Sequence, residues 1–581
     1  MAKENIIPER KTISDMFSSD TAYRIPDYQR PYSWSEEELE DLWEDLYESY
    51  INKNENLDYY FLGSVVVVND ESGYEDVIDG QQRLTTLMIM LNVLAKNFKN
   101  INIEKESSPQ IVKLKKITEK IYIDEEKDDS KLKLQSFYKY DTVFKKYIIN
   151  KELDFSNPYE VTKKELKMDD PTYKYKNTAN FFYGKFKELE EKTILGDFIN
   201  YIFYNVFLIK VTCTNRNFAI KIFQVMNDRG TPLTNADIIK SYIRQRCDTD
   251  ELVNLFNNNW SEMENIARKN ELSVDDIIVF YEYFKLKENP KKQASEELEQ
   301  IINNEKNISN LITEIHEFAL SVDKVYESKY KEVYALRYLP WKFYIITMLS
   351  SAYKVDYPEK ENLFKKIRKF YYTFFVAGET LNKIKQTSFN IIRCISEKQP
   401  IENIEREITA VLEKYPRVVQ RCIENLNDEV FYDKYLKPLM LTIDYENKED
   451  GCDFIELNKN IHMDHIIPRG YRKNQEGWGY INSEEANKLI NTIGNMALLN
   501  WDKNISAQNY DFTTKLGIYE GKGKSQGITT FNTTRNIIDN YNKDINKKSF
   551  DIEHIKERKI YLFSLISKIL EMEIPVQENI N

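Results

Sequence analysis

The chain has 581 residues, a formal net charge of −12 and 30% charged residues, beside 41% hydrophobic and 13% aromatic residues. This length predicts about three domains, and the apolar content is sufficient for large buried cores. The acidic balance excludes a uniformly basic, histone-like DNA binder. It leaves open a DNA-binding protein whose basic residues are grouped locally.

The cysteines and the hydropathy pattern indicate the compartment. The five cysteines are odd in number, lie far apart and form no CxxC pair, so we expect free thiols in a reducing cytosol. The chain has no basic-then-apolar signal pattern and no apolar run of about 18 residues. The sequence therefore predicts a soluble, cytoplasmic protein with no membrane partner.

The first 247 residues combine strand and helix patterns. The segment "RIPDYQRPY" is held extended by its prolines, and a helix follows from Ser35, where Glu38 completes a capping box. The β-branched runs at 61–70 and 74–80 predict paired strands, and 81–98 predicts a long helix. The sequence "DGQQR" therefore falls where a strand turns into a helix.

The next elements bracket a helical insertion at about 100–200. Residues 205–214 predict a further buried strand, which we expect to share one sheet with the strands before Gly80. The stretch "NRNFAIKIFQVMNDRGTPLTNADIIKSYI" then predicts a helix, a turn at Asp228-Arg229-Gly230, and a second helix capped by Thr234 with Asp237. Residues 248–444 show helical periods without strand-like runs and predict a helical array.

The C-terminal region predicts strand, long connection, strand, helix. The strands are "HMDHIIP" and "GNMALLN", a short helix "SEEANKLINTI" lies between them, and another helix starts at "WDKN". An apolar helix at 554–572 ends the pattern. We therefore predict a multidomain α+β protein with domains at 1–247, 248–444 and 445–581.

The C-terminal strand ends carry residues suited to phosphodiester hydrolysis. His465 suits the general base, because imidazole titrates near neutral pH. Asp464 and Asn504 offer oxygen ligands that suit Mg²⁺, and Asn495 could hold the imidazole or a neighbouring loop. Asp464 and His465 point to opposite faces of a regular strand, so one metal site can use both only where the strand ends or bends.

Two other interpretations of this region remain open. An isolated Asp-His pair is usually a surface feature. A zinc site could use Cys452, His462 and His465, but a fourth ligand is not evident and the spacing is irregular.

The pattern "DHIIP…GNMALLNWDKN" resembles the HNH, or ββα-metal, nuclease family over about residues 453–550. The resemblance implies Asp464 as a metal ligand, His465 as the general base, Asn495 as the asparagine that supports the site, and Asn504 as the second metal ligand. The last HNH position is often histidine and here is asparagine, which puts the ligand strength in doubt. Asn509 is a weaker candidate for an additional contact.

The "DGQQR" turn has the features of a phosphate site. Backbone N–H groups at the helix N-terminus attract phosphate, Gly80 allows close approach, and Arg83 offers forked donors. Asp79 could hold a metal or polarise a water. The plain alternative is a structural turn with a solvated arginine.

The arm "IPDYQRPYSW" places aromatic faces among hydrogen-bond donors. These groups could stack bases or bind phosphates, or they could clamp the arm to the core. The residues concerned are Tyr28, Gln29, Arg30, Tyr32 and Trp34.

The motifs "IPDYQRPYSW", "FLGSVVV", "VIDGQQR" and "FQVMNDRGTPLTNADIIK" together resemble the N-terminal domain of GmrSD-type modification-dependent restriction enzymes and of SspE-like phage-defence proteins. The resemblance covers about residues 13–246 and implies a ParB/sulfiredoxin-like fold. It implies binding and hydrolysis of GTP or ATP around Asp79, Gly80, Gln82 and Arg83, in a cleft lined by Tyr28, Gln29 and Arg30 that could sense DNA chemistry. Asn227, Gly230 and Thr234 match the family's second motif, with a role nearer to structure.

Together these features predict an antiphage, modification-dependent endonuclease for double-stranded DNA that uses Mg²⁺ or Mn²⁺ and a nucleoside triphosphate. Two alternatives stay open: a nucleotide-dependent DNA-binding switch with an inactive nuclease domain, and an RNA endonuclease. A homodimer is also left open.

Overall fold

The chain forms two compact units, Met1–Gln245 and Arg246–Asn581, which we describe separately. The computed structural model describes residues 6–17, 22–26, 29, 31–52, 59–69, 74–97, 134–135, 144–145, 171–192, 194–214, 218–219, 234–448, 454–522, 527–543 and 549–576. Within these residues, the helices that are long enough to span a membrane are too polar to do so.

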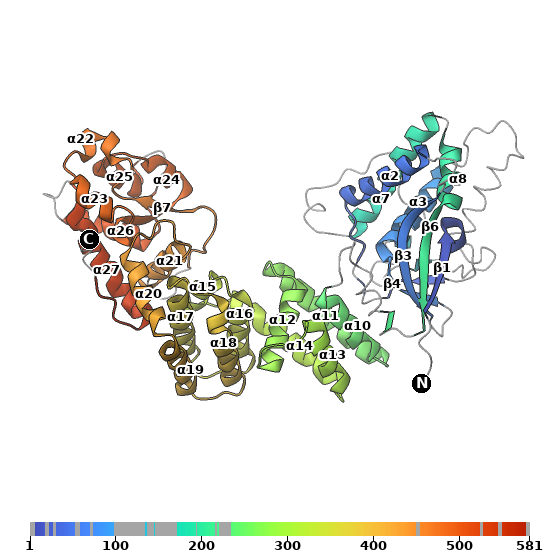
Figure 1. Cartoon of the computed structure of the whole chain (residues 1–581), viewed down its shortest axis with the longest axis horizontal. Helices are drawn as coiled ribbons and strands as arrows, with labels where there is room; N and C mark the ends of the chain where they lie inside the picture. The colour runs from blue at the N-terminus through green and yellow to red at the C-terminus, as the bar shows by residue number, and fades with distance from the viewer. Residues whose placement is uncertain are drawn as a thin grey trace, which may run out of the picture. The chain divides into compact units, whose positions relative to one another are not determined.

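The first unit is built on a six-stranded mixed sheet (Figure 1). β3 pairs antiparallel with β4 and parallel with β6, so the strands before Gly80 and after Tyr204 share one sheet, as predicted. The strands, in their order across the sheet, are β1 (Ile6–Thr12), β6 (Val206–Cys213), β3 (Tyr60–Asn69), β4 (Tyr74–Asp79), β2 (Ala22–Arg24) and β5 (Leu134–Gln135).

Helices cover this sheet and enclose an aromatic core. The ring of Trp43 in α2 contacts Phe182 and Phe186 of α7 and Phe198 of α8. The side chains of α3 from Leu84 to Leu94 are all buried, as expected of a helix that is apolar on every face. The helices of the whole unit, whether or not they cover the sheet, are α1 (Ile13–Met16), α2 (Glu36–Ile51), α3 (Gln81–Asn97), α7 (Pro171–Glu191), α8 (Leu195–Asn205) and α10 (Asn235–Gln245).

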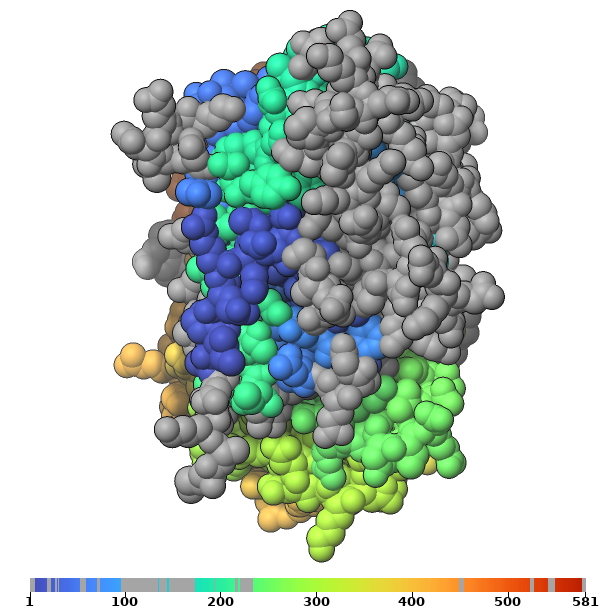
Figure 2. Space-filling model, turned by 90° about the vertical axis from the view of Figure 1, so that its right-hand side faces the viewer, coloured from blue at the N-terminus to red at the C-terminus, as the bar shows by residue number. Residues whose placement is uncertain are grey.

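The strand β1 lies at the edge of the sheet. Figure 2 shows the dark blue N-terminal residues at the surface of this unit, next to the blue-green residues near position 200. Ile6 and Ile7 are exposed, and Arg10 stacks over the rings of Tyr59 and Phe207. A cation therefore covers part of an edge that could otherwise pair with another strand.

Two predicted helix starts are confirmed. The backbone N–H of Ser35 donates to Glu38 at 2.6 Å, which is half of the predicted capping box of α2. Thr234 and Asp237 cap α10 reciprocally, at 3.2 Å in each direction. The preceding turn, with Asn227 and Gly230, lies outside the described residues.

The second unit begins as a helical array, as predicted. Between residues 248 and 444, all described, the structure contains no strand. The helices are α11 (Asp250–Lys269), α12 (Val274–Leu286), α13 (Ala294–Asn304), α14 (Ile308–Tyr326), α15 (Lys331–Arg337), α16 (Lys342–Lys354), α17 (Lys360–Val376), α18 (Leu381–Ser396), α19 (Ile401–Lys414), α20 (Pro416–Asn427) and α21 (Leu436–Glu446).

The C-terminal part of this unit contains the predicted pair of strands. β7 (Ile461–His465) pairs antiparallel with β8 (Met496–Asn500). The other elements are η2 (Tyr471–Lys473), α22 (Gln475–Trp478), α23 (Ser483–Leu489), η3 (Ile493–Asn495), α24 (Trp501–Ala507), α25 (Phe512–Tyr519), α26 (Asn532–Lys543) and α27 (Ile552–Leu570).

The second compact unit, Arg246–Asn581, continues across residue 445, and the third domain expected from there stays a prediction. The final helix α27 packs against α17 and α21, and Figure 1 shows it alongside the helical array. Arg368 of α17 pairs with Glu446 at 2.7 Å, and the buried Asp444 accepts from the backbone N–H of Thr533 at 2.9 Å. Buried polar contacts therefore run across the predicted boundary.

Candidate functional site

The first candidate site lies where β7 ends. Asp464 is opposite Ala497 and His465 is opposite Met496 in the β7–β8 pair. Because successive side chains of a strand alternate, Asp464 and His465 point to opposite faces. Asp464 contacts α25, whereas His465 contacts Asn491 and Phe431. The structure therefore does not bring the two motif residues onto one face.

Asp464 is held in a buried network. Lys515 Nζ donates to both carboxylate oxygens at 3.0 Å, and the Tyr519 hydroxyl donates to Oδ2 at 2.5 Å. Burial raises the pKa of Asp464 and lowers that of Lys515, while each charge favours the ionised form of the other. Lys515 also donates to the carbonyl oxygen of His465 at 2.5 Å, so the network fixes the end of β7.

His465 is held in one tautomer by its neighbours. Its Nε2 lies 3.0 Å from Asn491 Oδ1, and Asn491 Nδ2 donates to Glu429 Oε2 at 3.3 Å. An ionised carboxylate only accepts, so the Asn491 amide must direct its NH₂ to Glu429 and its oxygen to the imidazole. Nε2 of a neutral His465 therefore carries the hydrogen, and Nδ1 keeps a lone pair that can accept a proton.

The surroundings of His465 also keep it neutral. The Phe431 ring centroid lies 4.2 Å from that of the imidazole. Burial lowers the pKa of His465 to about 4, although the hydrogen bond that the imidazole donates to Asn491 Oδ1 acts in the opposite direction. At neutral pH the imidazole is therefore unprotonated, which is the form that a general base requires.

Asn495 supports the backbone, not the imidazole. Its side chain is fully buried; Nδ2 donates to the carbonyl oxygens of Ile467 and Ile490, and Oδ1 accepts from the N–H of Ile467 at 2.8 Å. These bonds use every strong donor of the amide group. Asn495 thus joins the segment after β7 to the segment before β8. Of the two roles that the sequence left open for it, holding the imidazole or holding a neighbouring loop, the structure shows the second.

Asn504 and Asn509 lie in and just after the helix that follows β8. Asn504 is half-buried in α24, and its side chain makes no hydrogen bond with any other residue in the described part of the chain. Its amide oxygen is thus available to a ligand. The side chain of Asn509 lies against Gly470, where an added Cβ would approach its Nδ2 to 3.1 Å. Asn509 therefore packs on the loop after β7.

The arrangement does not fit the predicted metal site as it stands. A divalent cation on Asp464 would lie beside the Lys515 ammonium, which already occupies both carboxylate oxygens. Among the described residues there is no group of three or more histidine, cysteine, aspartate or glutamate side chains that could hold a metal. Asn504 is the predicted ligand whose oxygen remains available, so metal binding by Asp464 stays a prediction that requires Lys515 to move.

The zinc alternative is not assembled in the described residues either. His462 and His465 are three positions apart on β7 and so point to opposite faces. The ring of His462 lies 4.9 Å from that of Trp501, and burial lowers its pKa. Cys452 lies outside the described residues.

Exposed cations follow the strand that carries His465. Arg469, Arg472 and Lys473 are all exposed, and Arg469 lies 5.5 Å from the centroid of the Tyr432 ring. Tyr432 is 70% exposed. Cations and a solvent-facing ring suit contacts to a phosphate backbone and a base. This local group supplies the positive charge that the acidic chain as a whole lacks.

The second candidate site is the turn between β4 and α3. Gly80 adopts φ +89°, and an added Cβ would approach Val65 Cγ2 to 2.8 Å, so this turn requires glycine. Gly63, at φ +124°, lets the Arg83 guanidinium lie against its backbone, and Arg83 Nη1 donates to the Ser64 carbonyl at 2.7 Å. Burial lowers the pKa of Arg83, which the nearby Asp79 partly offsets.

Arg83 retains unused donors at a helix start. It makes one hydrogen bond with the described residues, to Ser64, although a guanidinium has five N–H groups. The turn can therefore still offer the helix N-terminus and forked donors to an anion, which is the chemistry predicted for it.

The glutamines of this region tie down the arm. Gln82 accepts from the N–H of Ser33 at 2.8 Å and donates to the carbonyl of Pro31 at 3.1 Å. Gln29 is buried and donates to the Ile78 carbonyl at 3.0 Å, while the Tyr32 hydroxyl lies 2.8 Å from Thr86 Oγ1. These contacts favour the clamp over a ligand role for Gln82 and Gln29. Tyr28 and Arg30 lie outside the described residues.

Several residues that the sequence did not single out shape these sites. Gly63 lies within a run that predicts a strand, and a lone glycine in a strand can mark a close approach. Asn491 lies four residues before Asn495 and offers the same amide, so the sequence could not decide which one faces the imidazole. The others are Glu429, Phe431, Lys515 and Tyr519.

The first unit has a turn with donors suited to an anion on a mixed sheet, and the second has a hydrogen-bonded histidine on a strand that is followed by exposed cations. These features are typical of a protein that acts on nucleic acid phosphates. Residues 13–244 match the GmrSD restriction endonuclease N-terminal domain, and residues 418–565 match the C-terminal domain of GmrSD restriction endonucleases. Together the matches cover more than half of the chain, which belongs to the GmrSD restriction endonuclease family. No curated protein matches it.

Proposed function

We propose that this protein is a phage-defence endonuclease that hydrolyses double-stranded DNA, with His465 as the general base. The family supports a restriction endonuclease acting on DNA. The observation that carries the proposal is the neutral imidazole whose Nε2 is held by Asn491 while Nδ1 keeps its lone pair. This geometry suits proton removal from water.

In the proposed step, Nδ1 of His465 accepts a proton from a water molecule as the water oxygen attacks phosphorus. A new P–O bond forms and the bond to the leaving oxygen breaks, so the strand is cut by hydrolysis. Arg469, Arg472 and Lys473 would bind the phosphates on either side. Asn491 orients the base throughout, and Lys515 fixes the strand end that carries it.

Mg²⁺ or Mn²⁺ belongs to the proposal as the cofactor that the motif predicts. Such an ion would stabilise negative charge at the phosphate and leaving oxygen. Asn504 could offer it an oxygen, whereas Asp464 is engaged by Lys515. The metal requirement is tested directly by titrating chelator and divalent ions in a cleavage assay.

The first unit is proposed to bind GTP or ATP at the turn formed by Gly80 and Arg83 and to sense modified DNA. Support comes from the donors of Arg83 that no described residue uses, at the start of α3, and from Gly63, which lets the guanidinium lie against its backbone. Binding of each nucleotide to wild-type protein and to Arg83→Gln, measured by calorimetry, tests this part separately from cleavage.

The decisive variant for the nuclease is His465→Ala. We expect cleavage to fall by about 10²- to 10⁴-fold, the usual contribution of a general base. His462→Ala is the matched control, because it removes another histidine from the same strand and should keep activity. Wild-type cutting by His465→Ala would refute the proposed step.

A second function is favoured by one observation, the Lys515 ammonium on Asp464. If Asp464 must bind metal for activity, this arrangement describes an idle nuclease, and the protein would act as a nucleotide-dependent DNA-binding switch. Assays with unmodified, glucosylated and phosphorothioated DNA, with and without nucleotide and metal, separate the two functions. A matched RNA substrate tests the third reading, an RNA endonuclease.

A further inference from the structure

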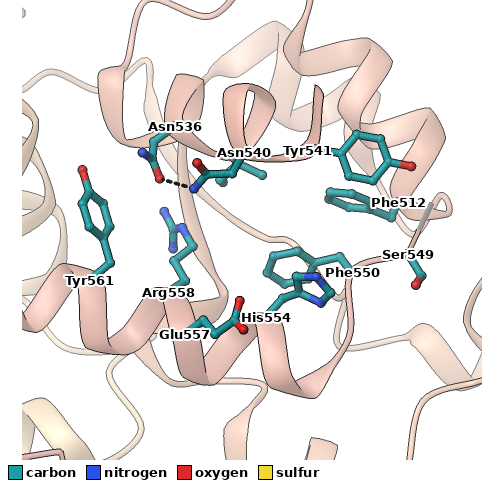
Figure 3. A pocket seen from close by; sticks show the side chains of 11 residues that line it. Phe512, Asn536, Asn540, Tyr541, Ser549, Phe550, His554, Glu557, Arg558 and Tyr561 are labelled. Atoms are coloured by element: carbon teal, nitrogen blue, oxygen red, sulfur yellow. Dashed lines mark hydrogen bonds between the residues drawn. The ribbon is translucent and has the colours of Figure 1, made fainter. Parts of the chain in front are cut away.

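A pocket in the second unit lies apart from the residues proposed for cleavage. It has a volume of about 320 Å³ and lies between α26, α27 and the start of α25. Figure 3 shows side chains from these elements pointing into a common space. A volume near the lower end of the range for small-molecule sites suits one compact ligand.

The pocket has two chemically different ends. The rings of Phe512, Tyr541 and Phe550 form one end, with Phe512 centred 5.0 Å from Tyr541 and 5.2 Å from Phe550. Figure 3 shows Asn536, Asn540 and Arg558 at the other end. An apolar, ring-lined wall therefore faces amides and a buried cation, with the exposed carboxylate of Glu557 also lining the pocket.

Arg558 is a buried cation without an acidic partner. It is 7% exposed and forms no ion pair with any described residue. Nη1 donates to the Gly494 carbonyl at 3.0 Å, and Nη2 donates to the Thr533 carbonyl at 3.4 Å, but Nε has no acceptor among the described residues. Burial lowers its pKa to about 10, so Arg558 is still charged at neutral pH. A buried charge of this kind is costly unless an anion compensates it.

We propose that this pocket binds a single nucleotide, with the base against Phe512, Tyr541 and Phe550 and the phosphate directed towards Arg558. Base–aromatic contacts are tolerant of base identity, and a guanidinium matches phosphate geometry. The asparagine amides can donate to phosphate or to base edges. The nucleotide could be free in solution or extruded from DNA, since both present the same base and phosphate.

The pocket is linked to the support of His465. Arg558 holds the carbonyl of Gly494 in η3, directly before Asn495, whose amide joins the two strand ends. Gly494 is required there because a Cβ would overlap the carbonyl oxygen of Ile555 in α27. A ligand that draws on Arg558 therefore acts on the turn that leads into the proposed nuclease site.

The first test measures binding of a deoxynucleoside monophosphate to the full chain by calorimetry, in the His465→Ala background so that cleavage plays no part. We expect Asn540→Asp, which adds a charge at an exposed pocket residue, to weaken binding about 3- to 10-fold. Glu557→Gln, which removes a charge from the pocket rim, should tighten it. Asn303→Asp is the matched control, because it makes the same change at an exposed site on α13.

The second test distinguishes the two sources. DNA containing 2-aminopurine reports extrusion by increased fluorescence, which Asn540→Asp should reduce if the base enters the pocket. Binding of the monophosphate without such a signal identifies a free nucleotide as the ligand. The proposal is overturned if neither ligand responds to Asn540→Asp and Glu557→Gln more than to Asn303→Asp. Because these assays do not require cutting, they stand apart from the proposed hydrolysis.

Discussion

The turn after β4 and the strand end of β7 both gather amides and charges, yet they use them in opposite ways. At the turn, the amide of Gln82 is hydrogen-bonded to the backbone of the arm, while most N–H donors of Arg83 form no hydrogen bond with the described residues. At the strand end, the cation Lys515 is hydrogen-bonded to Asp464, while the second ring nitrogen of His465 has no hydrogen bond with a described residue. The turn therefore has hydrogen-bond donors available to a ligand, whereas the strand end has a hydrogen-bond acceptor available.

This difference separates supporting residues from ligand-binding ones. A side chain whose polar atoms are each hydrogen-bonded within the protein stabilises the fold, and removing it leaves its partners unsatisfied. A side chain with unused capacity can meet a ligand. Gln82, Asn495 and Asp464 belong to the first kind in this structure, and Arg83 and His465 belong to the second.

The largest expected effect is on stability, at the Asp464–Lys515 pair. Lys515→Met leaves a buried carboxylate without its cation, which should cost about 3–5 kcal/mol, whereas Asp464→Asn combined with Lys515→Met should recover much of this loss. Hydrogen exchange of peptides around β7 and α25 measures the effect locally. Unchanged exchange in Lys515→Met, together with tighter metal binding, would instead make Asp464 a metal ligand.

The second effect is on cleavage, at Asn491. Asn491→Ala frees the imidazole to change tautomer and orientation, so we expect cleavage to fall about 10- to 100-fold. Since the base acts only when unprotonated and its pKa is about 4, the wild-type rate should decline as the pH drops through about 4. Asn491→Asp places a carboxylate beside the ring, raises the pKa of His465 and should move this decline to higher pH.

The pH–rate profile also provides the control for this variant. A residue with a merely structural role would lower the rate at all pH values and leave the decline in place. A profile that Asn491→Asp does not move would therefore contradict the positioning role of Asn491.

A smaller effect is expected at Gln82. Gln82→Ala removes the hydrogen bonds to Pro31 and Ser33, which should loosen the arm by about 1 kcal/mol and speed its amide exchange about fivefold. Binding of GTP or ATP should change little, in contrast to Arg83→Gln. Loss of nucleotide binding in Gln82→Ala with unaltered exchange of the arm would place Gln82 in the ligand site after all.

Local patterns allowed the sequence to predict the elements, but not the contacts between them. Alternating and β-branched runs predicted β3, β4 and β6, and the expectation that they share a sheet is confirmed. The strand pair β7–β8 was likewise predicted from local patterns. The α+β, multidomain fold class is confirmed, whereas the likeness to ParB and to ββα-metal nucleases stays a prediction.

The side-chain partners depend on packing over long stretches of chain. Lys515 lies in a helix 51 residues after Asp464, and no spacing rule connects them. Asn491 and Asn495 are near neighbours, but η3 turns the chain between them, so one amide faces the imidazole and the other the backbone. The Arg368–Glu446 ion pair crosses the predicted boundary at residue 445, and the sequence could not predict it, because a charged contact across a polar segment leaves no mark in composition.

The smallest effect, and the sharpest probe of the tautomer argument, is expected at Glu429. This residue is exposed, and its carboxylate accepts a hydrogen bond from the NH₂ group of Asn491 at 3.3 Å, which is its hydrogen bond to the site among the described residues. Glu429→Gln can donate as well as accept, so it no longer dictates which way the Asn491 amide faces. We expect a two- to threefold loss of cleavage, about 0.5 kcal/mol, with an unchanged melting temperature. Glu424→Gln, a similar exposed change on α20, should have no effect, and an equal loss in both variants would show that surface charge, not amide orientation, is responsible.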